Sequence, residues 1–124
     1  DTWASGAVKT VSEFASRIIM FREQGYKIVG YGAAAKGMTL LNYANADLDV
    51  IIDDNPLKQG RVSPGRHIPI VSMIEAAETF TDDDKILFVP LAWNFFDEIK
   101  GKILTHRTNG NDKFLRYFPE VVVR

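Results

Sequence analysis

A run of small residues, Gly30-Tyr-Gly32-Ala-Ala-Ala35-Lys36-Gly37, constrains the fold of this chain more than any other feature. The run follows a β-rich segment, residues 26–31, and leads into residues 36–45, whose apolar side chains suit a helix. A strand, a glycine turn and a helix in this order form the first half of a β-α-β unit, and such units build parallel sheets. The chain is therefore predicted to contain a parallel sheet covered by helices.

The rest of the chain continues this alternation. Apolar residues three and four apart predict an N-terminal helix over residues 5–24, and Ser72 with Glu75 forms an S-x-x-E capping box at the start of another helix. Further helices are expected over 36–45 and 93–106, and strands over 26–31, 48–52, 85–89 and 114–118, with a short additional strand within 68–71 as an option.

The predicted fold class is α/β, a Rossmann-like three-layer α/β/α domain preceded by an N-terminal helix. Its sheet is expected to be mainly parallel, with four or five strands. We favour the strand order 2-1-3-4, because the long loop over residues 58–69 could carry the chain across the first strand. The order 3-2-1-4 remains an alternative.

A nearly even charge argues against partners that are recognised by charge alone. The 124 residues include 15 Lys and Arg against 16 Asp and Glu, a net charge of −1, so we expect neither nucleic acid nor a membrane surface as a partner. The most apolar stretch, residues 86–96, is too short to span a bilayer and contains Pro90 and Asn94.

The absence of cysteine bears on metal chemistry and on location. With 0 Cys the chain can form neither a disulfide nor a thiolate zinc site, which fits a reducing compartment and predicts a cytoplasmic location. The chain begins at Asp1 rather than Met, which suggests a processed chain or a fragment of a longer polypeptide, and we expect a C-terminal fragment. Residues 1–124 are predicted to form a single domain.

The glycine turn has the residue types of a phosphate-binding turn. Gly30, Gly32 and Ala35 match the pattern G-x-G-x-x-[G/A], and the N-terminus of the following helix would present free N–H groups to an anion. Lys36 adds a positive charge. The alternative is that these small residues only let helix and strand pack closely. A Walker A reading is poor, because Met38 stands where the phosphate-binding lysine is required.

Polar residues follow the second predicted strand. Asp53 comes about 20 residues after Gly32, where Rossmann domains place the acid that binds ribose hydroxyls. The alternative is that Asp53 ends the strand through an Asx turn, since Asp and Asn favour turns. The next loop carries three basic residues that could face a diphosphate or solvent: Lys58, Arg61 and Arg66.

Other polar candidates have weaker support. Trp93 and Asn94 follow the third strand and could stack on and hydrogen-bond a base or sugar, or could pack in the core or against another domain. His67 and His106 are not expected to be catalytic. No residue is clearly placed to pair with His67, and His106 falls in the last turn of a predicted helix, where the helix dipole favours a cation.

Four segments together resemble the C-terminal domain of the S-adenosylmethionine-dependent sugar C-methyltransferases. They are residues 30–42, 52–60, 64–70 and 90–94, and the similarity extends over nearly the whole chain. The resemblance implies an enzyme that methylates a carbon of a deoxysugar linked to thymidine diphosphate (TDP). It also implies that a zinc-binding, Cys-rich segment and a central methyltransferase domain precede this domain in the same polypeptide.

The resemblance implies that this domain holds the nucleotide sugar while catalysis takes place elsewhere. A base in the central domain would remove the proton next to a 4-keto group, and the carbanion would attack the sulfonium methyl group. No catalytic residue and no cofactor is therefore expected here. The residues that would cradle the diphosphate are Gly30, Gly32, Ala33, Ala34, Lys36 and Gly37. Those expected toward the nucleoside or in nearby loops are Asp53, Asp54, Asn55, Lys58, Trp93 and Asn94.

Two other functions remain open from the sequence. One is an NAD(P)-binding domain of an oxidoreductase, with Asp53 on the ribose. The other is an interaction module that binds no small ligand and docks another domain through Trp93 and its neighbours.

Overall fold

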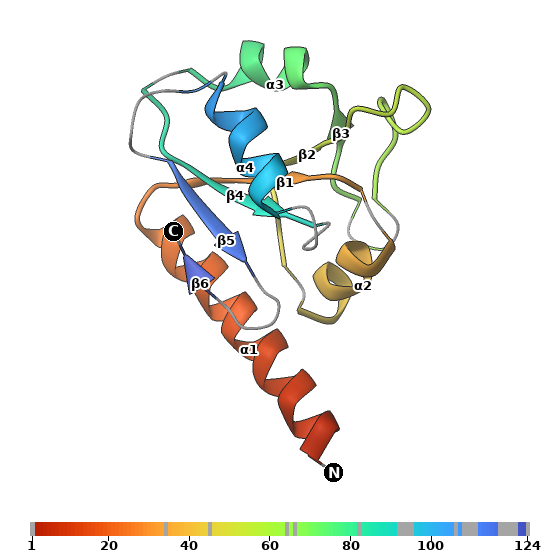
Figure 1. Ribbon diagram of the computed structural model, residues 1–124, viewed down its shortest axis with the longest axis vertical. Helices are drawn as coiled ribbons and strands as arrows, with labels where there is room; N and C mark the ends of the chain where they lie inside the picture. The colour runs from red at the N-terminus through yellow and green to blue at the C-terminus, as the bar shows by residue number, and fades with distance from the viewer. Residues whose placement is uncertain are drawn as a thin grey trace.

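Helices and strands alternate along the chain in the predicted order (Figure 1). The computed structural model describes residues 2–33, 35–44, 46–63, 65, 67–81, 83–91, 96–105, 107, 112–116 and 122–123. Its elements are α1 (Thr2–Glu23), β1 (Lys27–Tyr31), α2 (Ala35–Ala44), β2 (Val50–Ile52), β3 (Ile70–Val71), α3 (Met73–Thr79), β4 (Ile86–Pro90), α4 (Phe96–Leu104), β5 (Lys113–Arg116) and β6 (Val122–Val123).

The strands form one sheet in the order β3-β2-β1-β4-β5-β6. The first five of these run parallel to one another, and β6 pairs antiparallel with β5. The order differs slightly from the favoured prediction. The strands β2, β1, β4 and β5 follow one another as in the order 2-1-3-4, but among the described residues the sheet has six strands rather than four or five, and β3 joins it beyond β2, which gives the alternative order 3-2-1-4 for its first four strands. The Rossmann-like fold and the mainly parallel sheet are thus confirmed, and β3 and β6 extend the sheet by two-residue strands.

The predicted route across the sheet is wrong in one respect. The loop after β2 does not cross β1, because it leads outward to β3, which pairs with the far side of β2. The crossing is made by the next connection, which leaves β3, passes through α3 and enters β4 beside β1. Two-residue strands such as β3 give little sequence signal, which is why the loop seemed free to cross the sheet by itself.

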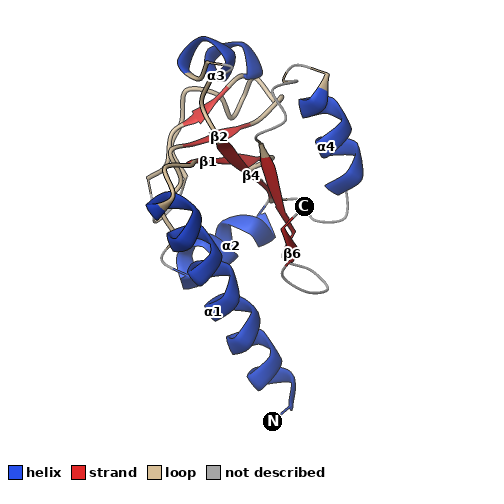
Figure 2. Ribbon diagram, turned by 90° about the vertical axis from the view of Figure 1, so that its left-hand side faces the viewer, coloured by secondary structure: helices blue, strands red, loops and turns tan. Residues whose placement is uncertain are grey.

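Helices cover both faces of the sheet (Figure 2). On one face, Phe14, Ile18 and Phe21 of α1 and Leu41 of α2 pack on the strands, and on the other face α3 and α4 do so. Neighbouring strand residues alternate between the two faces, with Ile28, Leu87 and Val89 on the α1 side and Val29, Phe88 and Phe114 on the α4 side. All five residues of β4 are buried, as expected for a central strand with helices on both sides.

The first helix extends beyond the rest of the molecule at its N-terminal end (Figures 1 and 2). Its C-terminal end closes with a Schellman motif, since Gly25 has a φ of +89°, the Tyr26 N–H donates to the Phe21 carbonyl at 3.0 Å and the Gly25 N–H donates to the Arg22 carbonyl at 3.0 Å. The Phe21 and Tyr26 rings meet edge to face, 4.9 Å apart. This hydrophobic contact anchors the turn that leads into β1.

A helix cap and a buried ion pair stabilise the face of the sheet that α3 and α4 cover. The predicted capping box is present, with the Ser72 hydroxyl accepting from the Glu75 N–H at 3.1 Å and the Glu75 carboxylate accepting from the Ser72 N–H. The Arg107 guanidinium donates to the Asp112 carboxylate at 2.7 Å, and Asp112 also accepts from the Ile86 N–H. This pair ties the segment after α4 to the starts of β4 and β5.

Candidate functional site

The direction of the chain reverses between β1 and β4. From β1 the chain passes through α2 to β2 on one side, and it returns from β3 through α3 to β4 on the other side. Open α/β sheets bind ligands beyond the carboxyl ends of the strands at such a switch point. The glycine turn follows β1 here, and the Leu91 N–H donates to the Tyr31 carbonyl at 2.9 Å, which ties the end of β4 to it. The fold therefore places the predicted turn at the expected edge.

Gly30 lies within β1 rather than in the turn. A Cβ at this position would approach Leu48 Cδ1 to 3.0 Å and Ile51 Cγ1 to 3.2 Å. Gly30 is therefore required by close packing on the α1 side of the sheet, which is the alternative that the sequence left open for the small residues.

Gly32 is the residue that turns the chain. Its φ of +83° lies in the left-handed region, where a side chain is disfavoured. Its N–H donates to the Ile52 carbonyl at 2.7 Å, and the next N–H, of Ala33, donates to Asp53 Oδ2 at 2.7 Å. Two amides that could have faced a phosphate are thus used within the protein.

The first turn of α2 carries the amides that remain for an anion. Lys36 and Gly37 belong to this turn, and the first N–H groups of a helix have no partner within the helix. Ala34 lies outside the described residues. The helix dipole places positive partial charge at this end of α2, so an anion bound here would find free amide donors in α2 rather than at Gly32 or Ala33.

Asp53 is a buried carboxylate that joins the two turns. It is 8% exposed, and besides accepting from Ala33 it accepts from the Asn55 N–H at 2.8 Å through Oδ1. The latter bond is an Asx turn, as the sequence alternative suggested. Asn55 repeats the pattern, because its Oδ1 accepts from the Leu57 N–H at 3.0 Å.

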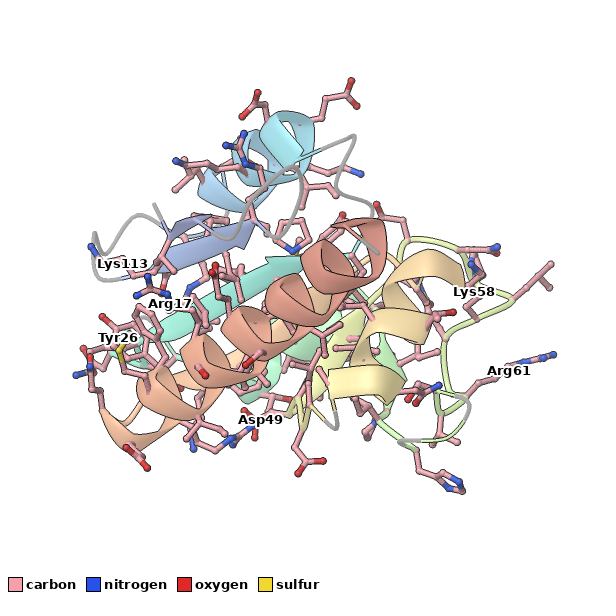
Figure 3. The ribbon with its side chains drawn as sticks, turned by 90° about the horizontal axis from the view of Figure 1, so that it is seen from below. Arg17, Tyr26, Asp49, Lys58, Arg61 and Lys113 are labelled. Carbon is pink, nitrogen blue, oxygen red and sulfur yellow. The ribbon has the colours of Figure 1, made fainter. Side chains whose placement is uncertain are left out.

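Two long side chains of the loop after β2 reach back to this network. The Lys58 ammonium donates to the Ala33 carbonyl at 3.0 Å and lies 4.0 Å from Asp53 Oδ2. The Gln59 amide donates to the Asp53 carbonyl at 2.8 Å. Figure 3 shows Lys58 and Arg61 at the opposite side of the molecule from Tyr26, which precedes β1. A lysine charge from the loop after β2 therefore lies next to the glycine turn.

A second polar cluster at this edge was not predicted. Asp54 Oδ2 accepts from the Tyr31 hydroxyl at 2.7 Å and from the Lys102 ammonium, which also lies 5.9 Å from the centre of the Tyr31 ring. Tyr31 ends β1 and Lys102 lies on α4, 48 residues after Asp54. We call these residues the Tyr31–Asp54–Lys102 cluster. Its one signal in the sequence is Tyr31, an aromatic residue with a hydroxyl group at the end of a strand, directly before the glycine turn.

The three groups of this cluster shift one another's pKa values. The hydrogen bond from Lys102, followed by the one from Tyr31, lowers the pKa of the Asp54 carboxyl. Burial, followed by the hydrogen bond to Asp54, raises the pKa of the Tyr31 phenol. The hydrogen bond to Asp54 raises the pKa of Lys102. At neutral pH the cluster therefore contains a carboxylate, an ammonium and a neutral phenol.

Not every residue singled out in the sequence can be placed relative to this edge. Trp93, Asn94, Arg66 and His106 lie outside the described residues. His67 is exposed in the loop after β2, with a φ of +58°.

A cavity of about 70 Å³ lies elsewhere, between α3, α4 and the sheet. It is lined mainly by apolar side chains of the core, among them Val29, Phe80 and Ile103. Such a cavity offers few polar groups for orienting a ligand, so we regard it as a packing feature.

Among the residues that the structure describes, no three or more His, Cys, Asp and Glu side chains come together in a way that could hold a metal ion. Within the same part of the chain, no helix combines the length and the apolar character that crossing a membrane requires.

The fold and the turn at its switch point define a Rossmann-like α/β domain. A family model described as the C-methyltransferase C-terminal domain matches residues 1–119, and the chain belongs to this family. C-methyltransferase NovU of Streptomyces niveus is 34% identical over 99 residues, which make up 77% of this chain and 22% of that protein. The chain thus spans about a fifth of the length of this relative, and the resemblance seen in the sequence is confirmed at the level of the family.

Proposed function

We propose that this chain is the substrate-holding domain of an S-adenosylmethionine-dependent C-methyltransferase that acts on a TDP-linked deoxysugar. The observation that carries the proposal is the strand–turn–helix unit at the switch point, with the N-terminus of α2 directed to the ligand-binding edge. Membership of the C-methyltransferase C-terminal domain family supports it.

The proposed diphosphate site combines helix amides with lysine charge. The first N–H groups of α2, at Lys36 and Gly37, would donate to phosphate oxygens, and Lys58 next to Ala33 would add a point charge. Gly32 and Asp53 would act by shaping the turn, because their polar groups are bonded within the protein. The other candidates for contacts to the ligand are Ala34, the side chains of Lys36 and Asn55, and the pair Trp93 and Asn94.

Catalysis is proposed to depend on another part of the longer protein. S-adenosylmethionine would supply the methyl group there, and a thiolate zinc site would have to lie outside this chain, which has 0 Cys. The role of this chain would be to orient the nucleotide sugar and hold it in place, which lowers the entropic part of the barrier. The proposal includes a cytoplasmic location.

A titration followed by NMR tests this function. We expect thymidine diphosphate to shift the amide resonances of Gly32, Ala33 and residues 35–37, and expect NADH and S-adenosylmethionine at the same concentration to leave them in place. Lys58→Ala should reduce these shifts, and Arg61→Ala is its matched control, because the Arg61 side chain lies on the same loop and is exposed. A response to NADH in place of the thymidine nucleotide would favour the oxidoreductase alternative, and no response to any of the three would favour an interaction module.

A further inference from the structure

Two neighbouring carboxylates at the carboxyl end of β2 have different surroundings. Asp53 is buried at 8% exposure, whereas the side chain of Asp54 is 52% exposed. Asp53 is directed to the glycine turn, and Asp54 is directed to Tyr31 and to α4. Only one of the two positions leaves a carboxylate oxygen accessible to a ligand.

The Asp53 carboxylate is already used by the backbone. Oδ2 accepts from Ala33 and Oδ1 accepts from Asn55, at 2.7 and 2.8 Å. A sugar hydroxyl that took either oxygen would have to compete with an amide in a buried position, and an amide left without a partner there would cost free energy. Asp53 therefore supports the turn and is poorly placed to bind a ligand.

Asp54 has one oxygen fixed and the other free to accept. Both of its hydrogen bonds, from Tyr31 and from Lys102, end on Oδ2, and no residue that the structure describes donates to Oδ1. The ammonium of Lys102 balances the negative charge of the carboxylate, so an approaching diphosphate would meet less repulsion than it would from an unpaired acid. The open oxygen is a hydrogen-bond acceptor at the carboxyl edge of the sheet, where the proposed diphosphate site also lies.

We propose that Asp54, rather than Asp53, accepts a hydrogen bond from a sugar hydroxyl of the nucleotide sugar, and that Tyr31 and Lys102 are positioning residues which aim its carboxylate. This inference rests on the proposed function. A nucleotide sugar carries hydroxyls on both sides of its diphosphate, on the sugar of the nucleoside and on the hexose, and either one has the required chemistry.

The test compares ligands that differ by one hydroxyl. Dissociation constants are measured by calorimetry for thymidine diphosphate, its 3′-deoxy analogue and TDP-glucose, with the wild-type chain, Asp54→Ala, Tyr31→Phe and Lys102→Gln. If the hydroxyl belongs to the nucleoside, the 3′-deoxy analogue should bind the wild-type chain about tenfold more weakly than thymidine diphosphate, as expected for the loss of a hydrogen bond to a charged group. Asp54→Ala should then bind the two ligands equally well. If it belongs to the hexose, wild type prefers TDP-glucose to thymidine diphosphate about tenfold, and Asp54→Ala loses this preference.

Two comparisons separate a ligand contact from a structural effect. Tyr31→Phe and Lys102→Gln should reduce the discrimination between ligands while the chain stays folded, whereas Asp83→Ala, an exposed acid before β4, should leave it unchanged. Equal weakening of all three ligands by Asp54→Ala, or unchanged discrimination, would overturn the inference while leaving the proposed function intact. Loss of discrimination in a folded Asp53→Asn variant would overturn it as well. If the wild-type chain bound none of the ligands, both the proposed function and the inference would fail.

Discussion

At the scale of single residues, Gly30 shows how closely the sheet and its covering segments approach one another. Gly30→Ala should lower the free energy of unfolding by roughly 1–3 kcal/mol, because the added methyl group would lie 3.0 Å from Leu48 Cδ1 in a buried position. Chemical denaturation measures the change. Gly101→Ala in α4 is the matched control, since nothing lies within 4 Å of the new Cβ, and it should stabilise the chain by up to about 1 kcal/mol. Equal effects of the two substitutions would contradict this account.

The ionisation of Asp54 should appear in the pH dependence of stability. Folding lowers the pKa of this carboxyl from its ordinary value of 3.8. The ionised carboxyl therefore stabilises the folded chain at pH values above the pKa of the unfolded chain, and this stabilisation is lost as the pH falls through the pKa of the folded chain. The difference in unfolding free energy between wild type and Asp54→Asn should be largest near neutral pH and should shrink in acid. We expect no more than about 1 kcal/mol, since the pair with Lys102 is half exposed and screened. A difference that stays constant from neutral to acidic pH would show that the ion pair is not its source.

At the scale of elements, the buried ion pair of Arg107 and Asp112 ties the segment after α4 to the starts of β4 and β5. The two side chains are 11% and 5% exposed, and Arg107 also donates to the carbonyls of Thr81 and Asp84. Asp112→Ala should destabilise the chain by roughly 3–5 kcal/mol, because it leaves a buried guanidinium without its counter-ion. Thermal unfolding measures the loss, and the exposed Asp83→Ala should change stability by less than about 0.5 kcal/mol. A loss as small as that of the control would show that the pair is not a main support of this face.

The elements themselves were predictable where their patterns were long. The N-terminal helix, β1, α2, β4 and the capping box at Ser72 could be located from periodicity and capping residues, and the structure confirms them. The two-residue strands β3 and β6 could not be placed in the sheet, because a strand this short has no period and depends on its neighbour for definition. Helix α4 is described from Phe96 to Leu104, and the predicted start at residue 93 lies outside the described residues.

The candidate site was predictable in place and only partly in detail. The glycine turn and the acids after β2 could be assigned to one edge of the sheet from spacing alone, because parallel strands end together. The different roles of Asp53 and Asp54 could not be predicted from the sequence, because they depend on hydrogen-bond partners as distant along the chain as Lys102. The same holds for Gly30, whose packing role depends on Leu48 and Leu91.

At the scale of the whole molecule, the strand order has a consequence for how the chain acquires its structure. β1 receives its second neighbour only when β4 arrives, with Lys27 opposite Ile86, so the centre of the sheet closes late during synthesis. Pairing across such a separation slows folding, and until it is complete the apolar segment Ile86–Pro90 and the open side of β1 are exposed to other chains. Refolding yield should therefore fall steeply as protein concentration rises, with Ile86–Pro90 as the segment through which misassembled chains associate.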